Sequence, residues 1–262
     1  MVPEARQVTT RMANNIIRLA AIGDLHCSQA SQAAIQASFS QIAESADLLL
    51  LAGDLTDHGR PDEAHMLARA LSAVRIPIVA VLGNHDFESD QQDQVRDIIA
   101  SAGVTLLDGD ACEVRGIGIA GVKGFAGGFG QRALRPWGEP TIKQFVREAV
   151  DEALKLEAAL ARLRTQQIVA LLHYAPVEQT VEGEPLEIYP FLGSSRLEEP
   201  LSRYPVTLVF HGHAHRGRLE GVTAGNVPVY NVSQPLLLRM FPDRPPFRIV
   251  ELPATPVEAV PL

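Results

Sequence analysis

Cysteine is scarce in this sequence, which contains only Cys27 and Cys112 and no CxxC spacing. A disulfide framework is therefore not expected, and isolated cysteines are typical of the reducing cytoplasm. Long apolar runs are also lacking, because no stretch approaches the roughly 18 apolar residues that span a bilayer. Residues 1–15 contain no apolar segment of the kind found in secretory signals. We therefore expect a cytoplasmic protein with no membrane anchor.

Positive charge is in deficit. The chain has 23 Lys and Arg residues against 31 Asp and Glu residues, a formal net charge of -8. Strong binding to nucleic acid is not expected, because a negative protein is repelled by the phosphate backbone. An acidic protein still binds a small phosphate compound where a bound metal ion outweighs the surrounding field. Any phosphate site must therefore be local and cationic.

The apolar residues fall into short segments. They make up 46% of the 262 residues, enough for one large domain over 16–252, between a polar tail at 1–15 and a Pro-rich tail at 253–262. Apolar periodicity predicts helices at 29–45, 61–74, 91–102 and 141–164. The turn residues 108–110 predict a hairpin. Strands are predicted at 15–22, 48–52, 76–82, 104–107, 111–114, 116–122, 168–172, 206–210, 227–231 and 247–252.

The stretch Leu48–Gly59, which reads LLLLAGDLTDHG, shows how these strands end. Its four leucines predict a strand that is buried on both faces. Gly53 then allows the backbone to turn sharply and to approach another group closely. Asp54 follows directly. A carboxylate beside a buried strand is costly unless a positive group, such as a metal ion, meets it.

Five predicted strands end in polar residues of this kind. Each motif alone is weak evidence, because Asp and Asn also serve turns and a single histidine is often a structural group. Together they are informative, since the carboxyl ends of strands in open α/β sheets lie at one edge. Carboxylate, amide and imidazole ligands suit Zn, Mn or Fe. The residues at these ends are Asp24, His26, Asp54, Asn84, His85, His173, His213 and His215.

The order of these motifs is DLH, GDLTD, GNHD, a single His and GHAH, and it resembles the calcineurin-like metallophosphoesterase superfamily. The resemblance extends over about residues 16–232. It implies an α/β fold, a four-layer αββα sandwich in which two mixed β-sheets are flanked by helices. It also implies a dinuclear metal site at the strand ends, with two divalent or trivalent ions such as Mn, Fe or Zn.

The resemblance further implies a role for each residue. His85 would be catalytic, stabilising the transition state or protonating the leaving oxygen. Asp86, also catalytic, would orient His85, and the alternative is that Asp86 only caps the following turn. The ligands of the two ions, which share Asp54, would be Asp24, His26, Asp54 and His215 for one and Asp54, Asn84, His173 and His213 for the other.

The GNHD motif and the compact chain resemble the branch of the superfamily that contains cyclic-nucleotide phosphodiesterases. We therefore expect a metal-dependent phosphodiesterase, in which a metal-bridging hydroxide attacks phosphorus in line. The expected partner is a small phosphate ester, such as a nucleotide. Tyr174 departs from this branch, which often has a second histidine at that position.

Three other functions are weighed against this one. A phosphomonoesterase is the main alternative, although His58 and Asp86 stand where the resemblance to phosphoprotein phosphatases would require an arginine and a glutamate. A nuclease is disfavoured because the chain is acidic and lacks an added DNA-contacting domain. A metal-free scaffold that binds proteins is disfavoured because every ligand position is filled.

Several further residues have two interpretations. His58 either grips substrate phosphate weakly or faces solvent, and His211 either supports the ligands or packs at a strand end. In the Gly-rich loop at 123–137, the basic residues either meet a substrate's phosphate or base, with the aromatic residues stacking, or pack at the surface, which is the simpler expectation. These residues are Lys123, Arg132, Arg135, Phe125, Phe129 and Trp137. The Pro-rich connection at 174–204 has the length of a functional lid. Cys27 is expected to be a buried residue that only packs in the core.

Overall fold

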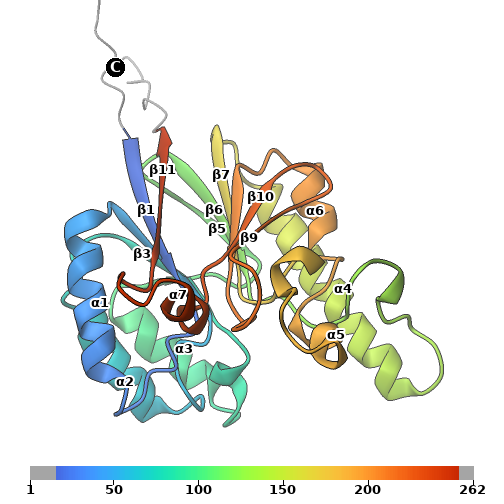
Figure 1. The fold of residues 1–262 in the computed structure, drawn as a ribbon, viewed down its shortest axis with the longest axis horizontal. Coiled ribbons are helices and arrows are strands. Elements are labelled where there is room, and N and C mark those ends of the chain that lie inside the picture. The colour runs from blue at the N-terminus through green and yellow to red at the C-terminus, as the bar shows by residue number, and fades with distance from the viewer. Residues whose placement is uncertain (1–15, 254–262) are drawn as a thin grey trace, which may run out of the picture.

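The computed structural model describes residues 16–253. The expected tails at 1–15 and 253–262 lie outside the described residues, apart from Pro253. The described chain forms two β-sheets that face each other, with helices on the outer side of each (Figure 1). This arrangement confirms the predicted four-layer sandwich. Among the described residues, no helix is long and apolar enough to cross a membrane.

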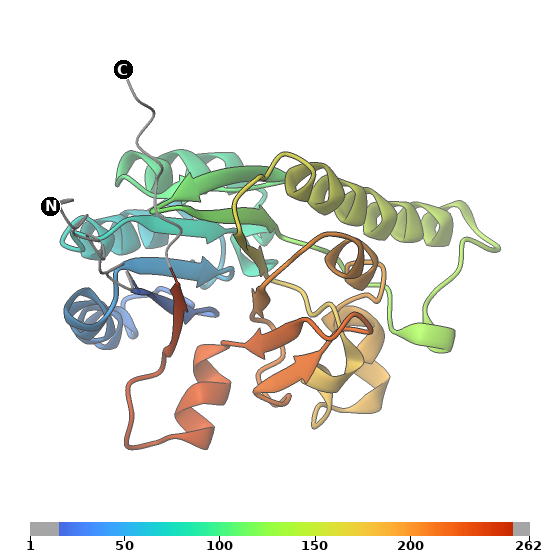
Figure 2. The ribbon, with the colours of Figure 1, turned by 90° about the horizontal axis from the view of Figure 1, so that it is seen from above.

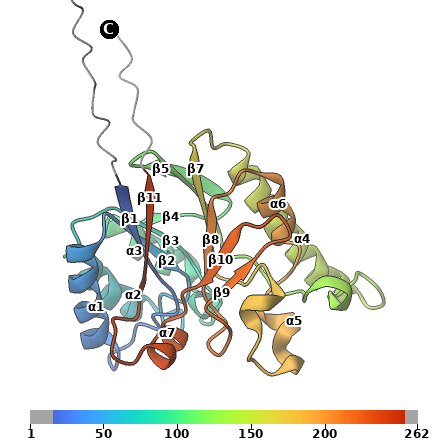
Figure 3. The same cartoon turned by 45° about the horizontal axis from the view of Figure 1, so that its top comes forward.

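The first sheet has five strands in the order β11-β1-β2-β3-β4. Strands β1 to β4 are parallel, whereas β11 is antiparallel to β1, so that the last strand lies beside the first (Figure 3). The strands are β1 (Ile16–Ile22), β2 (Leu48–Ala52), β3 (Ile78–Val81), β4 (Thr105–Leu106) and β11 (Arg248–Pro253).

The second sheet has six strands in the order β5-β6-β7-β8-β10-β9. Its central strands β6, β7, β8 and β10 are parallel, and the outer strands β5 and β9 are antiparallel to their neighbours. Both sheets are therefore mixed. The strands are β5 (Asp110–Val114), β6 (Ile117–Val122), β7 (Gln167–Leu172), β8 (Leu208–His211), β9 (Glu220–Val222) and β10 (Pro228–Asn231).

Helices cover the two outer faces. The first sheet is covered by α1 (Gln32–Ser45), α2 (Pro61–Leu71) and α3 (Gln92–Ser101). The second is covered on the opposite side of the molecule by α4 (Pro140–Leu160) and α6 (Glu198–Arg203), as Figures 1 and 2 show. The remaining helices are α5 (Tyr189–Leu192) and α7 (Gln234–Met240), with 3₁₀ turns at His85–Phe87, Gly130–Arg132, Glu178–Val181 and Leu186–Ile188.

Strand β2 shows why an unbroken apolar run is needed in this fold. Leu48 and Leu50 point between the two sheets. Leu49 and Leu51 point to the other face, where they pack with Phe39 of α1 in the hydrophobic core between the first sheet and its helices. Because all four leucines are fully buried, each contributes about 1.5–3 kcal/mol of hydrophobic stabilisation. The strand is thereby fixed, and so is the position of the residues that follow it.

The predicted hairpin at 108–110 is wrong. Strand β4 belongs to the first sheet and β5 to the second, so these residues carry the chain from one sheet to the other. The hairpin instead joins β5 to β6. Arg115 and Gly116 form its turn with φ of 54° and 79°, the left-handed pair that a tight two-residue turn requires.

Some elements escape sequence periodicity because they are short. Strand β9 has three residues and pairs only with β10. Helix α7 has seven residues, and its second residue is a proline. The connection at 174–204 contains two 3₁₀ turns together with α5 and α6. None of these elements is long enough to repeat an apolar pattern twice.

Candidate metal centre

The predicted ligands come together where five parallel strands end. β1, β2 and β3 of the first sheet lead to Asp24, Asp54 and Asn84. β7 and β8 of the second sheet lead to His173 and to the segment that holds His213 and His215. Side chains from the two sheets are close enough to share an ion, so the centre lies across the interface between the sheets.

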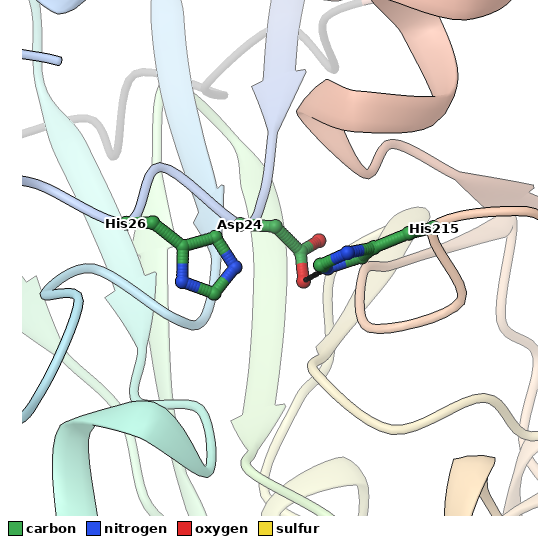
Figure 4. A group of neighbouring side chains, drawn as sticks. All are labelled: Asp24, His26 and His215. Carbon is green, nitrogen blue, oxygen red and sulfur yellow. Dashed lines mark hydrogen bonds and ion pairs between the residues drawn. The ribbon is translucent and has the colours of Figure 1, made fainter.

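One cluster forms around Asp24. The ligand atoms of Asp24, His26 and His215 lie within 4.8 Å of one another. His215 Nε2 is 3.0 Å from Asp24 Oδ1. Figure 4 shows the Asp24 carboxylate directed at the His215 ring, with His26 on its other side. His26 also reaches Asp54, with 3.8 Å between Nε2 and Oδ2.

A second cluster forms around His173. Asp54, His173 and His213 also offer ligand atoms within 4.8 Å of one another. His173 Nε2 lies 2.9 Å from Asn84 Oδ1 and 3.3 Å from Asp54 Oδ1. Its other nitrogen, Nδ1, donates to the carbonyl of Ala52 at 2.9 Å, which fixes the ring as metal-binding histidines usually are fixed. Asp54 therefore stands between the two clusters.

The backbone holds the ligands in an unusual conformation. Asp24, His26, Asp54 and His213 all have positive φ, between 43° and 68°. This left-handed region is unfavourable for residues other than glycine and is concentrated at functional sites. The backbone N–H of His213 donates to both oxygens of Asp24, at 3.0 and 2.9 Å. These contacts aim the carboxylate before any ion binds.

Glycines of the motifs leave room for the carboxylates. A Cβ on Gly83 would lie 2.1 Å from Asp54 Oδ1, and a Cβ on Gly212 would lie 2.4 Å from Asp24 Oδ2. No side chain fits at either position without displacing a carboxylate. The glycine in GNHD and the one in GHAH are therefore part of the cradle around the acidic ligands.

The sequence model of the calcineurin-like phosphoesterases matches residues 17–217, which is most of the chain. The chain belongs to this family. No curated protein matches the sequence. The family assignment confirms the resemblance seen in the motifs and places the chain in a superfamily of hydrolytic phosphoesterases.

Solved structures share the fold of this phosphoesterase. The phosphopantetheinyl hydrolase of Mycobacterium tuberculosis superposes with a TM-score of 0.62 at 21% identity, over 93% of this chain and 98% of that one. A protein of Thermus thermophilus superposes with a TM-score of 0.56 at 15% identity, over 92% of this chain and 100% of that one. A putative 5'-nucleotidase from Staphylococcus aureus gives 0.51 at 16% identity, over 83% of this chain but 48% of that one. At these identities the likeness concerns the fold.

The histidines of the phosphoesterase fit metal ions. Within residues 16–253, neither ring nitrogen of His26 has a hydrogen-bond partner, although both are enclosed. Burial lowers the pKa of His26 to about 4 and that of His213 to about 3, and it also lowers the pKa of His173. These rings are therefore neutral, which is the form that binds a metal ion.

The carboxylates also fit a cation. Burial raises the pKa of Asp54 to about 7, and the Asp24 carboxylate adds to this. Burial opposes ionisation of Asp24 as well, but its hydrogen bond with His215, together with the other nearby imidazoles, outweighs it and lowers the pKa of Asp24. The negative charge of Asp24 thus opposes ionisation of Asp54, and a bound cation would allow both carboxyl groups to ionise.

His85 lies beside the ligands with its ring held from behind. Its Nδ1–H donates to the carbonyl of Asp57 at 2.7 Å, and Glu88 Oε1 is 3.4 Å from the same nitrogen. Burial lowers the pKa of His85, but the Asp57 carbonyl and the Asp54 charge more than offset this and raise it above its ordinary value. His85 can therefore carry a proton into the site.

The structure corrects the expected partner of Asp86. The motif predicts that Asp86 orients His85, but its buried carboxylate accepts hydrogen bonds from the N–H groups of Leu55, Thr56 and Gly83 and from the Thr56 hydroxyl. Burial raises the pKa of Asp86 to about 6, and the Asp54 charge adds to this. Asp86 thus ties the end of β2 to the GNHD turn, and a catalytic contribution by Asp86 stays a prediction.

Replacing Asp86 with alanine is expected to lower the free energy of unfolding by about 3 kcal/mol, because three buried N–H groups lose their acceptor. Urea denaturation at a fixed metal concentration measures this loss. Asp97→Ala on the exposed face of α3 is the matched control and is expected to change stability by less than about 0.5 kcal/mol. An equal effect of the two substitutions would contradict the role of Asp86.

Sequence reasoning missed two acidic neighbours of His85. Glu88 was not identified, although a residue three positions after His85 lies on the same side of a 3₁₀ turn. It also pairs with His58, at 3.0 Å between Oε2 and Nδ1. Asp57 was recognised only as part of a motif, yet its carboxylate lies 3.5 Å from His26. The three-residue spacing from His85 could have indicated Glu88, whereas no local pattern encodes the contact between Asp57 and His26.

The other ambiguous residues have simpler positions. His211 is buried and its Nε2 lies 2.8 Å from the Thr180 hydroxyl, as expected for a packed strand-end histidine. Cys27 is buried, in agreement with the prediction. Arg132, Arg135 and Trp137 are exposed. Lys123 differs from them, because its ammonium lies among aromatic rings next to the second cluster.

Proposed function

We propose that this member of the family is a metal-dependent phosphodiesterase with a dinuclear centre. The first ion would be held by Asp24, His26, Asp54 and His215, and the second by Asp54, Asn84, His173 and His213. This division is supported by two of the three groups of neighbouring ligand atoms and by Asp54, which the third group places beside His26 and His85. When bound, the ions supply the positive charge that polarises the phosphoryl group and activates the attacking water. Their identity is proposed as Mn, Fe or Zn from the ligand types.

The protein residues then divide the remaining work. His85 keeps a proton on Nδ1 through Asp57 and presents Nε2 to the site, where a protonated imidazolium would give its proton to the leaving oxygen. Asn84 coordinates without adding negative charge, so the phosphate is not repelled by a further carboxylate. Proton transfer of this kind typically contributes about 10²–10⁴-fold to the rate.

The acids around His85 carry the preference for diesters over monoesters. Asp57 and Glu88 both lie within 4 Å of imidazoles at this edge of the site. His58, where an arginine would offer a permanent positive charge, is paired with Glu88 instead. A monoester is largely a dianion near neutral pH, whereas a diester carries one negative charge. The diester is therefore repelled less by these carboxylates.

The test compares bis-(p-nitrophenyl) phosphate with p-nitrophenyl phosphate, using Mn²⁺-loaded protein. We expect kcat/KM to be at least about tenfold higher for the diester, which corresponds to about 1.4 kcal/mol of transition-state free energy. Chelation should abolish turnover and lower the melting temperature, because an ion that binds only the folded state stabilises it. Re-addition of Mn²⁺ should restore both.

Preference for the monoester would identify a phosphomonoesterase instead. Turnover that persists after complete metal removal would contradict the metal-dependent mechanism. Nucleotide diesters and phosphopantetheinyl diesters belong in the wider substrate panel, because the names of two structural neighbours refer to a nucleotidase and a phosphopantetheinyl hydrolase.

A further inference from the structure

Tyr174 lies in the wall of the second cluster without a role in the proposed mechanism. It follows His173 at the end of β7 and is 7% exposed. The centroid of its ring lies 4.5 Å from that of His213 and 5.4 Å from that of His173. The ring therefore packs against two of the three residues in the Asp54–His173–His213 cluster. A phosphate held at that cluster would lie next to Tyr174.

The Tyr174 hydroxyl has no protein partner in the described structure. Within residues 16–253, no residue forms a hydrogen bond with this hydroxyl. The hydroxyl is nevertheless not fully enclosed, because it is absent from the set of enclosed polar atoms without a partner. It therefore faces a space that water or a ligand can enter. A phenol is protonated at neutral pH and donates one hydrogen bond. Phosphate oxygens accept such bonds readily.

Lys123 also contacts the Tyr174 ring. Its backbone carbonyl accepts the N–H groups of both His173 and Tyr174, at 3.1 Å each. Its ammonium lies 5.3 Å from the centroid of the Tyr174 ring and 5.4 Å from that of Phe87, just after the GNHD motif. Cation–π contacts of this kind stabilise the aromatic rings. Lys123 thus connects Tyr174 to the turn that carries Asn84 and His85.

A purely structural tyrosine explains the ring but not the hydroxyl. Phenylalanine would make the same contacts with His213, His173 and Lys123. A hydroxyl in a largely buried wall is favourable only when a polar partner meets it. At this position the described residues supply no partner, so the hydroxyl is met by water or by a group bound at the neighbouring cluster.

We propose that Tyr174 is a substrate-binding residue, whose hydroxyl donates a hydrogen bond to a non-reacting oxygen of the substrate phosphate, and that Lys123 positions its ring. This inference rests on the proposed phosphoesterase function and extends it to a residue outside the metal ligands. The hydrogen bond links a neutral donor to a charged acceptor. Removing it should weaken phosphate binding by roughly 10- to 100-fold.

The test uses Tyr174→Phe, which removes one oxygen and keeps the ring. We expect KM for the diester and the Kd of inorganic phosphate, measured by calorimetry on Mn²⁺-loaded protein, to rise by at least about tenfold. Metal content and melting temperature should stay as in the wild type. Tyr230→Phe is the matched control, because the Tyr230 ring also packs under a cation, with Arg248 3.8 Å from its centroid, but lies between the sheets.

Lys123→Met tests the positioning role. Methionine keeps an unbranched apolar chain and loses the charge. We expect a smaller rise in the Kd of phosphate, about threefold, from a lost cation–π contact. In the double variant the effect should be no larger than in Tyr174→Phe alone, because Lys123 acts through the ring. Additive effects would show that Lys123 acts independently of the Tyr174 hydroxyl and would overturn this part of the proposal.

Failure of the inference differs from failure of the proposed function. An active wild type whose Tyr174→Phe variant binds phosphate and substrate equally well would overturn the role of Tyr174 alone. A wild type without phosphoesterase activity would reject the proposed function. The calorimetric comparison of phosphate binding would still decide the role of Tyr174 in that case.

Discussion

Replacement of Asp54 by asparagine is expected to reduce kcat/KM by at least about 10³-fold. Asp54 belongs to the second cluster, and its ligand atom also lies within 4.8 Å of those of His26 and His85, so its loss as a carboxylate weakens both proposed metal sites at once. The loss corresponds to about 4 kcal/mol of transition-state stabilisation, in the range that metal-ion catalysis supplies. Metal analysis of the purified variant should show less than two ions for each chain.

The control for this substitution is Asp62→Asn. Asp62 lies in the first turn of α2 and is exposed, so the same chemical change there should leave activity and metal content unaltered. Near wild-type turnover of Asp54→Asn with a full complement of metal would show that Asp54 does not bridge two ions.

Replacement of His85 by alanine is expected to lower kcat by about 10²–10⁴-fold while metal content stays near that of the wild type. His85 contacts the Asp57 carbonyl and lies among the ligands, but the proposed mechanism gives it a proton to transfer and no ion to hold. Because its pKa is raised, the wild-type rate should fall as the pH rises above that pKa and His85 loses its proton. This alkaline limb should be absent from the variant.

His65→Ala on the exposed side of α2 is the matched histidine control. A more activated leaving group provides a second check, since p-nitrophenolate needs less help from an acid than an alkoxide does. The loss caused by His85→Ala should therefore be larger for an alkyl ester than for an aryl ester. If the variant instead loses its metal ions, His85 is a ligand and the proton-transfer role is wrong.

The sequence was most informative where burial dictates the residue type. The run of leucines in β2 predicted a strand covered on both faces, and the carboxylate of Asp54 directly after it predicted a positive partner. The same pattern at five strand ends predicted which side chains the structure brings together. Their chemical roles as ligands stay predictions.

The sequence was least informative where the structure depends on contacts between distant segments. Asp86 looks like a partner of its neighbour His85, yet it binds Thr56 and Leu55, some thirty positions away. Residues 108–110 have the composition of a hairpin turn, but the strands before and after them belong to different sheets. Local chemistry is the same in both alternatives, so only the tertiary arrangement decides between them.

The contact between Asp24 and His213 has a consequence for how the protein is made. These residues are 189 positions apart, and β1 completes its sheet only by pairing with β11, the last strand of the described chain. Forming such distant contacts is entropically slow, so the cradle is assembled late in folding. A nascent chain on the ribosome offers isolated histidines and carboxylates but no chelating pocket. Metal uptake should therefore follow synthesis of β11, and tight retention of metal would report that residues 16–253 have folded.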